Sequence, residues 1–500
     1  MASWPAMRSV GSHHEDRHAR VDRAFIEAMI VGSSATTGVV RDRVRVVVIT
    51  DDVLTATMAG PAIRAWHIAE ALAIDQDVVL ATTSDLCELS SPRFSVESAS
   101  RSRFVELEQW CDVAIVQGYL LHNVPELRGS KKVMLFDLYD PLHLEALELT
   151  RDDAEPERSV NVANTVRTLE EQLVRGDFFI CASDKQRDLW LGFLAALGRI
   201  NPRTYEADTT LRRLIDVVPF GLPDDPPLHT RAALRGVVPG IGPDDDVVIW
   251  GGGLYDWFDP GTLIRAIDRV RLLRPRVRLF FLGMRHPKPD IEESGVAVEA
   301  RRLADTLGLT GKHVFFNEGW VAYDDRQNYL LESDVGVSLH LDHLETMYSF
   351  RTRMLDYLWT GLPIVSTAGD GFAEIISARG IGTVVPAGDV DAVVSALVEL
   401  LGDPQARAAC RERAAAVASG FRWSTVLEPV VGFCAAPHRA ADMPGWGGEG
   451  GPPTPPAPSE PGSGGLGRDL GRVALLYRQG GIRAVAGGIG RRLGPLLRRR

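Results

Sequence analysis

Short apolar runs alternate with amphipathic stretches along this 500-residue chain, and this alternation constrains the fold more than any other feature. The first array opens with VRVVVIT at 44–50, a β-branched run short enough to be a strand buried on both faces. Further runs follow at DVVLAT, DVAIVQ, KVMLFDL, FFICAS and IDVVPF, several of them separated by helical periodicity. Strands that alternate with helices predict a parallel sheet with right-handed crossovers.

The same pattern restarts after a polar, proline-rich stretch, with VVIWGGG, VRLFFLG, HVFFNEG, DVGVSLH, LPIVST and GTVVP. The sequence therefore predicts an α/β protein with two Rossmann-like, doubly wound domains that face a central cleft. Ligands bind such sheets at the carboxyl ends of the strands, near helix N-termini. The expected division is a mobile leader, an acceptor domain, a linker, a donor domain, a disordered Pro/Gly linker and a basic tail: residues 1–42, 43–221, 222–246, 247–436, 437–467 and 468–500.

The net charge of −11 hides an asymmetry. Residues 468–500 hold nine arginines and one acid, Asp469, which gives +8 and leaves −19 on the rest of the chain. An acidic body disfavours nucleic acid as a partner, whereas an arginine-rich tail with apolar residues at near-helical intervals is typical of a helix lying on an anionic membrane surface. The alternative of a solubilising tail stays open, because Gly480, Gly481, Gly487, Gly488, Gly490 and Gly494 each weaken a helix by about 1 kcal/mol.

Several other classes are disfavoured by missing patterns. The five cysteines form no C-x-x-C pair, the first residues have no apolar signal-peptide core, and no uncharged apolar run reaches the eighteen residues of a membrane helix. The motifs of P-loop nucleotidases and α/β-hydrolases are also absent, and no G-x-G-x-x-G opens a helix after the first strand, which disfavours a dehydrogenase. We expect a cytoplasmic protein, at most peripheral on the inner face of the cell membrane, without a cofactor.

Two acidic clusters invite a metal interpretation. LHLDHLE at 339–345 holds two histidines and two acids, and Asp51–Asp52 follows the first strand. We interpret the first as a polar loop whose side chains face different ways, and the second as solvated loop residues or helix caps. No metal is therefore expected.

A helix with functional consequences is predicted within ETMYSFRTRMLDYLWTGLPIVST at 345–367. A strand should end at His340, a helix should begin near 349–352, and Gly361–Pro363 should end that helix before the next strand. A helix N-terminus placed after a parallel strand presents free N–H groups and a positive dipole to an anion.

Charged residues in this segment suit a nucleoside diphosphate. Arg351 and Arg353 supply planar cations for phosphate oxygens, and Asp356 lies about one turn further on, where it suits ribose hydroxyls. The alternative that stays open is a surface helix with incidental arginines.

The segment resembles the donor site of the GT4-type glycosyltransferases, whose fold is called GT-B. That family shows E-G-F-G, four residues, then E-A-M-A-x-G-x-P-V-V; Phe350 matches its phenylalanine, and Asp356 stands where its second glutamate holds the ribose. AGPAIRAWHIAEALA, FICAS, VVPFGLP and TAGDGFAEII…GTVVPAGD are similar to further family segments in the same order, from about 44 to 433.

Two departures separate this chain from the family pattern. Tyr348 stands where the first glutamate of the family contacts the donor sugar, and GGGLYDWFDPG at 251–261 lacks the arginine and lysine that neutralise the diphosphate. Arg351 and Arg353 are the expected replacements for these cations, and Glu345 for the glutamate. The losses also leave open an inactive, membrane-associated partner subunit with the same fold.

The resemblance implies transfer of a hexosyl-type sugar from a nucleotide-sugar donor to a glycan or polyprenyl-linked acceptor, with retention and without a metal, in cell-surface polysaccharide or glycolipid synthesis. A nucleotide-sugar epimerase is the nearest enzymatic alternative. The expected catalytic residues are Glu345, Arg351 and Arg353. The expected donor-binding residues are Gly252, Gly253, Trp320, Ser349, Phe350, Thr352 and Asp356. The expected acceptor-side residues are Gly60, Arg64, His67, Gln117, Tyr119, Asp137 and Asp140.

Overall fold

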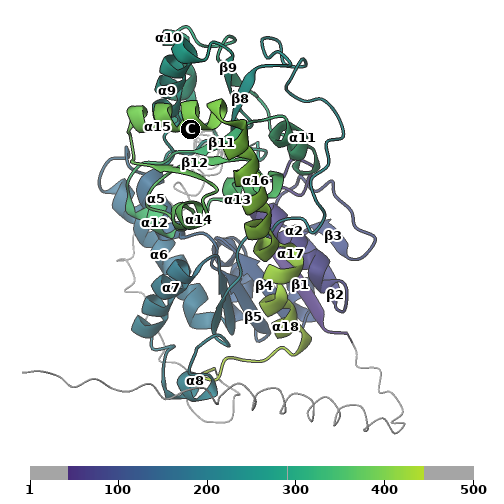
Figure 1. Cartoon of the computed structure of the whole chain (residues 1–500). Helices are drawn as coiled ribbons and strands as arrows, with labels where there is room; N and C mark the ends of the chain where they lie inside the picture. Colours follow the sequence, from purple (N-terminus) through teal and green to yellow (C-terminus); the bar gives the residue numbers. More distant parts are fainter. Residues whose placement is uncertain (1–42, 290, 444–500) are drawn as a thin grey trace, which may run out of the picture. The chain divides into compact units, whose positions relative to one another are not determined.

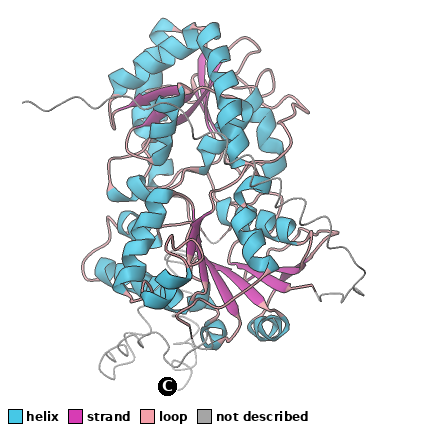
Figure 2. Ribbon diagram, turned by 60° about the horizontal axis from the view of Figure 1, so that its bottom comes forward, coloured by secondary structure: helices cyan, strands magenta, loops and turns pink. Residues whose placement is uncertain are grey.

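Two parallel sheets organise the protein. The computed structural model describes residues 43–289 and 291–443, and the sheets, drawn in magenta in Figure 2, are flanked by helices. The first sheet has the order β3-β2-β1-β4-β5-β6-β7, and the second has the order β10-β9-β8-β11-β12-β13. Every strand pair in both sheets is parallel, so the predicted α/β class with two doubly wound sheets is confirmed.

The strands of the first sheet are β1 (Arg45–Thr50), β2 (Asp77–Thr82), β3 (Ser95–Ser98), β4 (Val113–Gln117), β5 (Val133–Asp137), β6 (Phe178–Cys181) and β7 (Ile215–Val217). Those of the second are β8 (Asp246–Trp250), β9 (Val277–Phe281), β10 (Val314–Phe316), β11 (Val335–Ser338), β12 (Ile364–Thr367) and β13 (Gly382–Val385).

The helices between the strands of the first sheet are α2 (Gly60–Leu72), α3 (Arg101–Trp110), α4 (Leu120–Asn123), η1 (Pro125–Gly129), α5 (Leu142–Leu149), α6 (Glu157–Arg175), α7 (Asp184–Ala196) and α8 (Pro202–Ala207). Those from β8 onward are α9 (Pro260–Leu273), α10 (Gly295–Thr306), η2 (Tyr323–Asp325), α11 (Arg326–Leu331), α12 (Leu344–Tyr348), α13 (Thr352–Thr360), α14 (Gly371–Arg379), α15 (Val390–Gly402), α16 (Pro404–Ala418), η3 (Ser419–Phe421), α17 (Trp423–Val426) and α18 (Glu428–Ala435). Figure 1 labels most of them, and α9 and α15 pack against each other there.

Both sheets are buried on both faces, which explains their continuous apolar runs. In β1, Val46 and Val48 enter one hydrophobic cluster while Val47 and Ile49 enter another. The strand β8 divides its side chains in the same way between two clusters. A run that is apolar at every position is the pattern such a strand needs.

The strand β3 is the exception that the sequence analysis missed. Its residues Ser95–Ser98 read SVES, and the strand lies at the edge of the first sheet with no fully buried side chain. An edge strand exposed in this way needs no apolar run, so composition does not reveal it.

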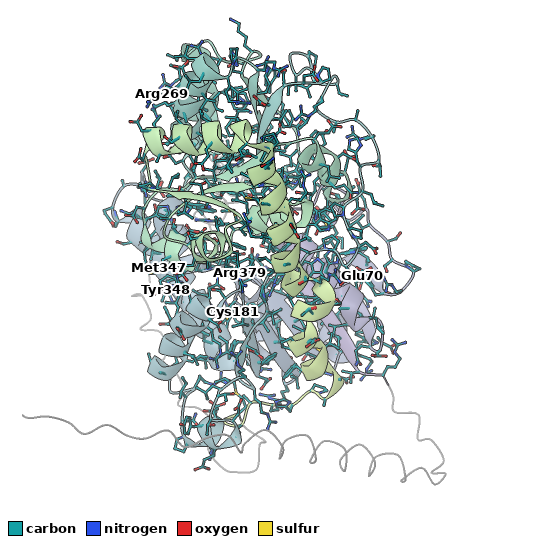
Figure 3. The ribbon with its side chains drawn as sticks, in the orientation of Figure 1. Glu70, Cys181, Arg269, Met347, Tyr348 and Arg379 are labelled. Atoms are coloured by element: carbon teal, nitrogen blue, oxygen red, sulfur yellow. The ribbon has the colours of Figure 1, made fainter. Side chains whose placement is uncertain are left out.

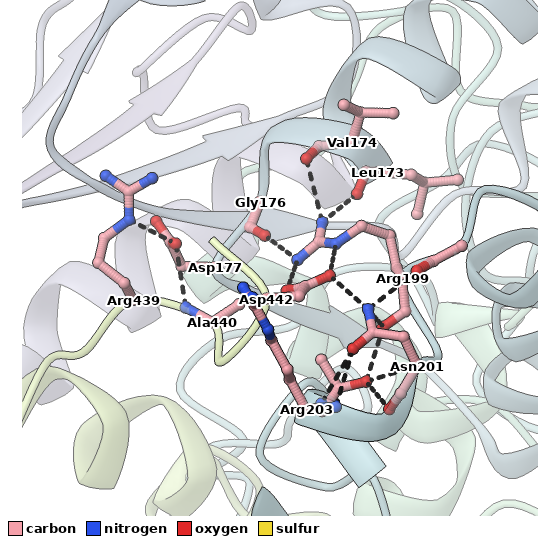
Figure 4. Close-up of polar contacts among 12 residues, drawn as sticks. Leu173, Val174, Gly176, Asp177, Arg199, Asn201, Arg203, Arg439, Ala440 and Asp442 are labelled. Carbon is pink, nitrogen blue, oxygen red and sulfur yellow. Dashed lines mark hydrogen bonds and ion pairs between the residues drawn. The ribbon is translucent and has the colours of Figure 1, made fainter. Parts of the chain in front are cut away.

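A C-terminal segment returns to the first sheet. After α18, Arg439 donates to Asp177 at 2.8 Å, and Asp442 accepts two hydrogen bonds from Arg199 at 2.7 and 3.1 Å (Figure 4). Residues 439–442, which the sequence analysis assigned to a disordered linker from residue 437, are instead held in place by these contacts. The partners of these residues lie more than two hundred positions earlier, where no local pattern indicates them.

The remaining expected boundaries stay predictions as a division into domains. The leader at 1–42, most of the Pro/Gly linker and the basic tail at 468–500 lie outside the described residues. Within the described ranges, no helix combines the length and apolar character that crossing a bilayer requires.

The pair between Arg199 and Asp442 generates a stability prediction. Both side chains are almost fully buried, and Arg199 also donates to the carbonyl oxygens of Leu173, Val174 and Gly176. Replacing Asp442→Ala leaves a buried guanidinium without its carboxylate, so we expect a loss of about 3–5 kcal/mol in urea unfolding. The double variant Arg199→Met/Asp442→Leu should recover much of that loss.

Glu299→Ala is the control for this prediction, because its pair with Arg302 is exposed and should leave the unfolding midpoint unchanged. A midpoint for Asp442→Ala that equals the wild-type value would contradict a buried ion pair at this position.

Candidate functional site

The strand order places a binding crevice at the carboxyl ends of β8 and β11, where the order of the second sheet reverses. A cavity lies at this edge. Most of its wall comes from the loop after β8, the segment around Trp320, and the first turns of α13. Its lining residues are Met58, Gly60, Ile63, Phe220, Gly251, Gly252, Gly253, Tyr255, Leu282, Gly283, Trp320, Val321, Tyr323, Arg326, Thr352, Arg353 and Asp356.

The helix α13 confirms the predicted start and end. It begins at Thr352 and ends at Gly361, whose φ of 71° lies in the left-handed region that favours glycine. Among the described residues, no side chain caps its N-terminus, whereas Ser183, Ser294 and Asp370 cap α7, α10 and α14. The free N–H groups and the positive end of the helix dipole are thus available beside the cavity.

Tyr357 fixes α13 against the sheet. Its hydroxyl accepts a hydrogen bond from the Gly251 N–H at 2.8 Å and donates to the Val337 carbonyl oxygen at 2.9 Å. A Cβ at Gly336 would lie 2.6 Å from the ring of Tyr357, so only glycine fits beneath it. This contact sets the position of the first turn of α13 relative to the loop after β8.

Arg353 lies where α13 and this loop meet. Its Nη2 donates to the Gly253 carbonyl oxygen at 2.7 Å, and a Cβ at Gly252 would lie 3.8 Å from its guanidinium carbon. The guanidinium faces the rings of Phe258 at 4.1 Å and Trp250 at 4.7 Å. Its other terminal nitrogen, Nη1, is buried and has no partner among the described residues.

No carboxylate of the described residues compensates the charge of Arg353. Five arginines of the described chain are buried, and four of them pair with a carboxylate: Arg64 with Asp137, Arg199 with Asp442, Arg326 with Asp356 and Arg351 with Glu345. No such pair is found for Arg353 in the described ranges.

Burial, together with the neighbouring charge of Arg351, lowers the pKa of Arg353 to about 10. The side chain therefore stays protonated at neutral pH. It is a cation at the positive end of a helix, an arrangement that costs stability unless an anion arrives.

The sequence analysis expected Arg351 to be a cation that is open to the diphosphate, and the structure differs. Its two terminal nitrogens donate to the Glu345 carboxylate at 3.0 and 2.6 Å, and both side chains are buried away from the cavity wall. Phe350 packs against Phe372 at 4.8 Å between ring centres and does not line the cavity either. The partner of Phe350, Phe372, lies outside the segment, so the segment alone could not show where Phe350 points. The partner of Arg351, Glu345, lies inside the segment, six positions earlier.

Two polar groups just before α13 also have hydrogen-bond partners. The Tyr348 carbonyl oxygen accepts a hydrogen bond from the Gln186 side chain, and the Ser349 hydroxyl donates to the Thr346 carbonyl oxygen in α12. Tyr348 is labelled in Figure 3. Of the donor-side residues expected from the sequence, the cavity wall brings together Gly252, Gly253, Trp320, Thr352, Arg353 and Asp356.

Arg326 is a site residue that the sequence analysis missed. It begins α11 and lines the cavity, and its Nε donates to Asp356 Oδ1 at 2.9 Å. Asp356 lies thirty positions away, and no motif links the two. Its burial, and its position at a helix start against the dipole preference, are visible only in the structure.

The expected acceptor-side residues form a buried network rather than an open surface. Arg64 donates to Asp137 at 2.6 Å and to backbone carbonyl oxygens, and Gln117 donates to the same carboxylate at 3.1 Å. Of this expected group, Gly60 alone lines the cavity described above.

The other acceptor-side residues have local partners or a perturbed charge. His67 lies 3.2 Å from Glu70 and stacks on Trp423, and the Tyr119 hydroxyl lies 3.3 Å from that of Thr165. Burial raises the pKa of Asp140 well above its usual range, as do the nearby charges of Glu145 and Asp137.

The structure tests the interpretation of the two clusters at 339–345 and 51–52. Within residues 43–289 and 291–443, no group of three potential ligands is placed to hold a metal ion. His340 faces Asp370 at 3.7 Å, whereas His343 caps α12 and lies 3.7 Å from Glu345, so only some of these side chains point different ways. Asp52, however, is buried rather than solvated, which corrects the interpretation of the acidic pair.

Comparisons with known proteins define the class first. Sucrose-phosphate synthase from Thermosynechococcus elongatus, 17% identical, aligns over 77% of this chain and 96% of its own, with a TM-score of 0.55. Anabaena HepE in complex with UDP-glucose, 14% identical, aligns over 78% and 99%, with a TM-score of 0.56. These likenesses and the two parallel sheets define a protein of the GT-B fold.

The sequence comparisons then show which family part of the chain resembles. Residues 245–403 match the model of glycosyl transferases group 1. A GDP-mannose-dependent α-(1-6)-phosphatidylinositol monomannoside mannosyltransferase of Mycolicibacterium smegmatis is 30% identical over 156 residues. The match spans 29% of this chain and about a third, 36%, of that relative. The part of the chain that holds the second sheet is therefore similar to the group 1 glycosyl transferases.

Asp52 generates a pH prediction. Burial raises the pKa of its carboxyl group to about 6, from about 3.8 in an unfolded chain. The fold therefore favours the protonated form, and the stability of the wild-type protein falls as the pH rises from 4 through 6. We expect Asp52→Asn to raise the free energy of unfolding at pH 8 by up to about 3 kcal/mol, with a gain that shrinks towards pH 4.

Urea unfolding at a series of pH values measures this gain, and Asp85→Asn, which changes an exposed acid nearby, serves as the control. A gain that is constant across this pH range would show that the Asp52 carboxyl is not the titrating group.

Proposed function

We propose that this protein transfers a sugar from a nucleoside diphosphate sugar to a glycan or polyprenyl-linked acceptor. The observation that carries the proposal is Arg353, the buried cation without a carboxylate partner among the described residues, beside the uncapped N-terminus of α13. A diphosphate supplies the missing negative charge, and Gly252 and Gly253 let it approach the backbone.

The chemistry follows from the charge of the leaving group. Glycosyl transfer passes through an oxocarbenium-like state while the nucleoside diphosphate departs, so a cation fixed before the reaction stabilises the departing charge. Arg353 does this from α13, together with the N–H groups of Thr352 and its neighbours. In this way it replaces the cations that GGGLYDWFDPG lacks, and the missing family arginine and lysine do not by themselves imply an inactive protein.

The finer features of the proposal come from the family resemblance and from the relatives. They are retention of the anomeric configuration, a hexosyl group, independence of metal, and a role in cell-surface polysaccharide or glycolipid synthesis. The curated relative is named for GDP-mannose, and the HepE structure holds UDP-glucose, so these are the first donors to test. Product NMR reports the anomer, and an unchanged rate in EDTA supports metal independence.

Arg353→Met tests the proposal with two opposite readouts. Titration calorimetry with GDP and UDP should show at least a 100-fold loss of affinity for whichever nucleotide the wild-type protein binds, because the diphosphate loses its cation. The ligand-free variant should unfold at higher urea, with a gain of about 1 kcal/mol or more, because an uncompensated buried charge is gone.

Arg351→Met is the matched control, two residues away. It leaves Glu345 buried without its partner, so it should lower stability instead. If Arg353→Met binds the diphosphate as tightly as the wild-type protein, the site is misplaced and the proposed transfer loses its basis.

Membrane attachment is a separate part of the proposal, supported by the composition of residues 468–500 alone. Nine arginines there suit an anionic surface on the cytoplasmic side of the membrane. Deleting residues 466–500 should weaken co-sedimentation with phosphatidylglycerol vesicles and change nothing with phosphatidylcholine vesicles. Equal sedimentation of the deleted and full chains with the anionic vesicles would remove this part.

A further inference from the structure

Arg326 and Asp356 form a polar pair in the cavity wall. The proposed stabilisation of the diphosphate by Arg353 does not involve this pair. The Arg326 guanidinium lies over the Tyr323 ring at 3.6 Å and over the Trp359 ring at 4.8 Å. Its Nη1 donates to the Tyr323 carbonyl oxygen, and its Nε donates to Asp356. These contacts hold both the plane and the position of the guanidinium.

The pair leaves one donor and one acceptor unused. Arg326 Nη2 is buried and has no hydrogen-bond partner within the described ranges. Asp356 Oδ1 accepts from Arg326, whereas no hydrogen bond to Oδ2 is found in the same ranges, and the carboxylate is 22% exposed at the cavity. A buried N–H of a charged group without an acceptor is costly, so it points to a ligand atom.

A hydroxyl group fits this combination. It can donate its hydrogen to the carboxylate and accept a hydrogen bond from the guanidinium with a lone pair. Asp356 lies about one helical turn beyond Thr352 and Arg353, on the same face of α13. A ligand whose diphosphate meets the first turn would therefore bring its ribose to this pair.

We propose that Arg326 is a specificity-determining residue that selects ribonucleoside diphosphate donors over 2′-deoxyribonucleoside diphosphate donors. The inference rests on the proposed function. Nucleotide donors differ at the 2′-position, and the cis-diol of a ribonucleotide supplies one hydroxyl more than a deoxynucleotide can. A donor without it leaves Arg326 Nη2 unpaired, and sites built to bond a hydroxyl reject analogues that lack it.

Matched nucleotide pairs test the inference directly. Titration calorimetry compares UDP with 2′-deoxy-UDP and GDP with 2′-deoxy-GDP, and within each pair only one oxygen differs. For the nucleobase that the protein binds, the wild-type chain should prefer the ribonucleotide by at least 20-fold. Arg326→Lys keeps a cation beside Asp356 but removes the planar fork, so the preference should fall below about threefold.

Arg231→Lys is the control variant. Arg231 also pairs with an aspartate, Asp325, and lies over a tyrosine ring, that of Tyr329, but it is exposed and does not line the cavity. Its preference should equal that of the wild-type protein. If Arg326→Lys does not fold, the wild-type preference and its loss in Asp356→Asn decide the matter instead.

The outcomes separate the two proposals. Equal affinity of the wild-type protein for the two members of a pair, or a preference that Arg326→Lys leaves intact, would overturn the role of Arg326 and leave the proposed function standing. Failure of every ribonucleoside diphosphate to bind would overturn both. A ribose preference that collapses in Arg326→Lys and persists in Arg231→Lys would support the inference.

Discussion

The packing of Tyr357 between α13 and the second sheet determines the geometry of the candidate site. Its hydroxyl bonds the end of β8 and the end of β11 together, and its ring lies on a glycine in β11 that no larger residue can replace. The tyrosine side chain has few rotamers, so this contact leaves the first turn of α13 little freedom to move relative to the sheet. The loop after β8, the helix N-terminus and the guanidinium of Arg353 therefore keep their relative positions without a ligand, as preorganised electrostatic stabilisation requires.

Two arginines near the N-terminus of α13 illustrate how a candidate binding site can lower the stability of the fold. Arg351 is neutralised by Glu345, so it contributes to the fold, whereas Arg353 has aromatic faces and one carbonyl oxygen but no counter-charge among the described residues. The unfavourable position relative to the helix dipole is retained at a site where an anion would relieve it. The same logic applies to the unpaired nitrogen of Arg326, since both unpaired donors belong to residues of one cavity wall.

The sequence predicted the fold well and the site only in part, for different physical reasons. Strands buried on both faces need apolar residues at nearly every position. Strands such as β1 and β8 can therefore be predicted from their composition, whereas the edge strand β3 cannot. The limits of α13 follow from local signals such as Gly361. Which of Arg351 and Arg353 reaches the cavity depends on Glu345, Phe258 and Gly253, and the pairing of Arg326 with Asp356 joins two helices. Apart from the pair of Arg351 with Glu345, which are six positions apart, these contacts are tertiary, and a single sequence does not encode them in any local pattern.

The return of the C-terminal segment to the first sheet bears on how the chain is made. Arg199 is completed by Asp442, which follows it by 243 residues. At a translation rate of about 5–20 residues per second, the ribosome needs roughly 12–50 s to supply that carboxylate. During this interval the first sheet must hold a guanidinium that lacks its counter-charge, so it reaches its final form only after the second sheet has been synthesised. Synthesis from the N-terminus thus couples the folding of the two halves. An isolated N-terminal half would lack the carboxylate that pairs with Arg199.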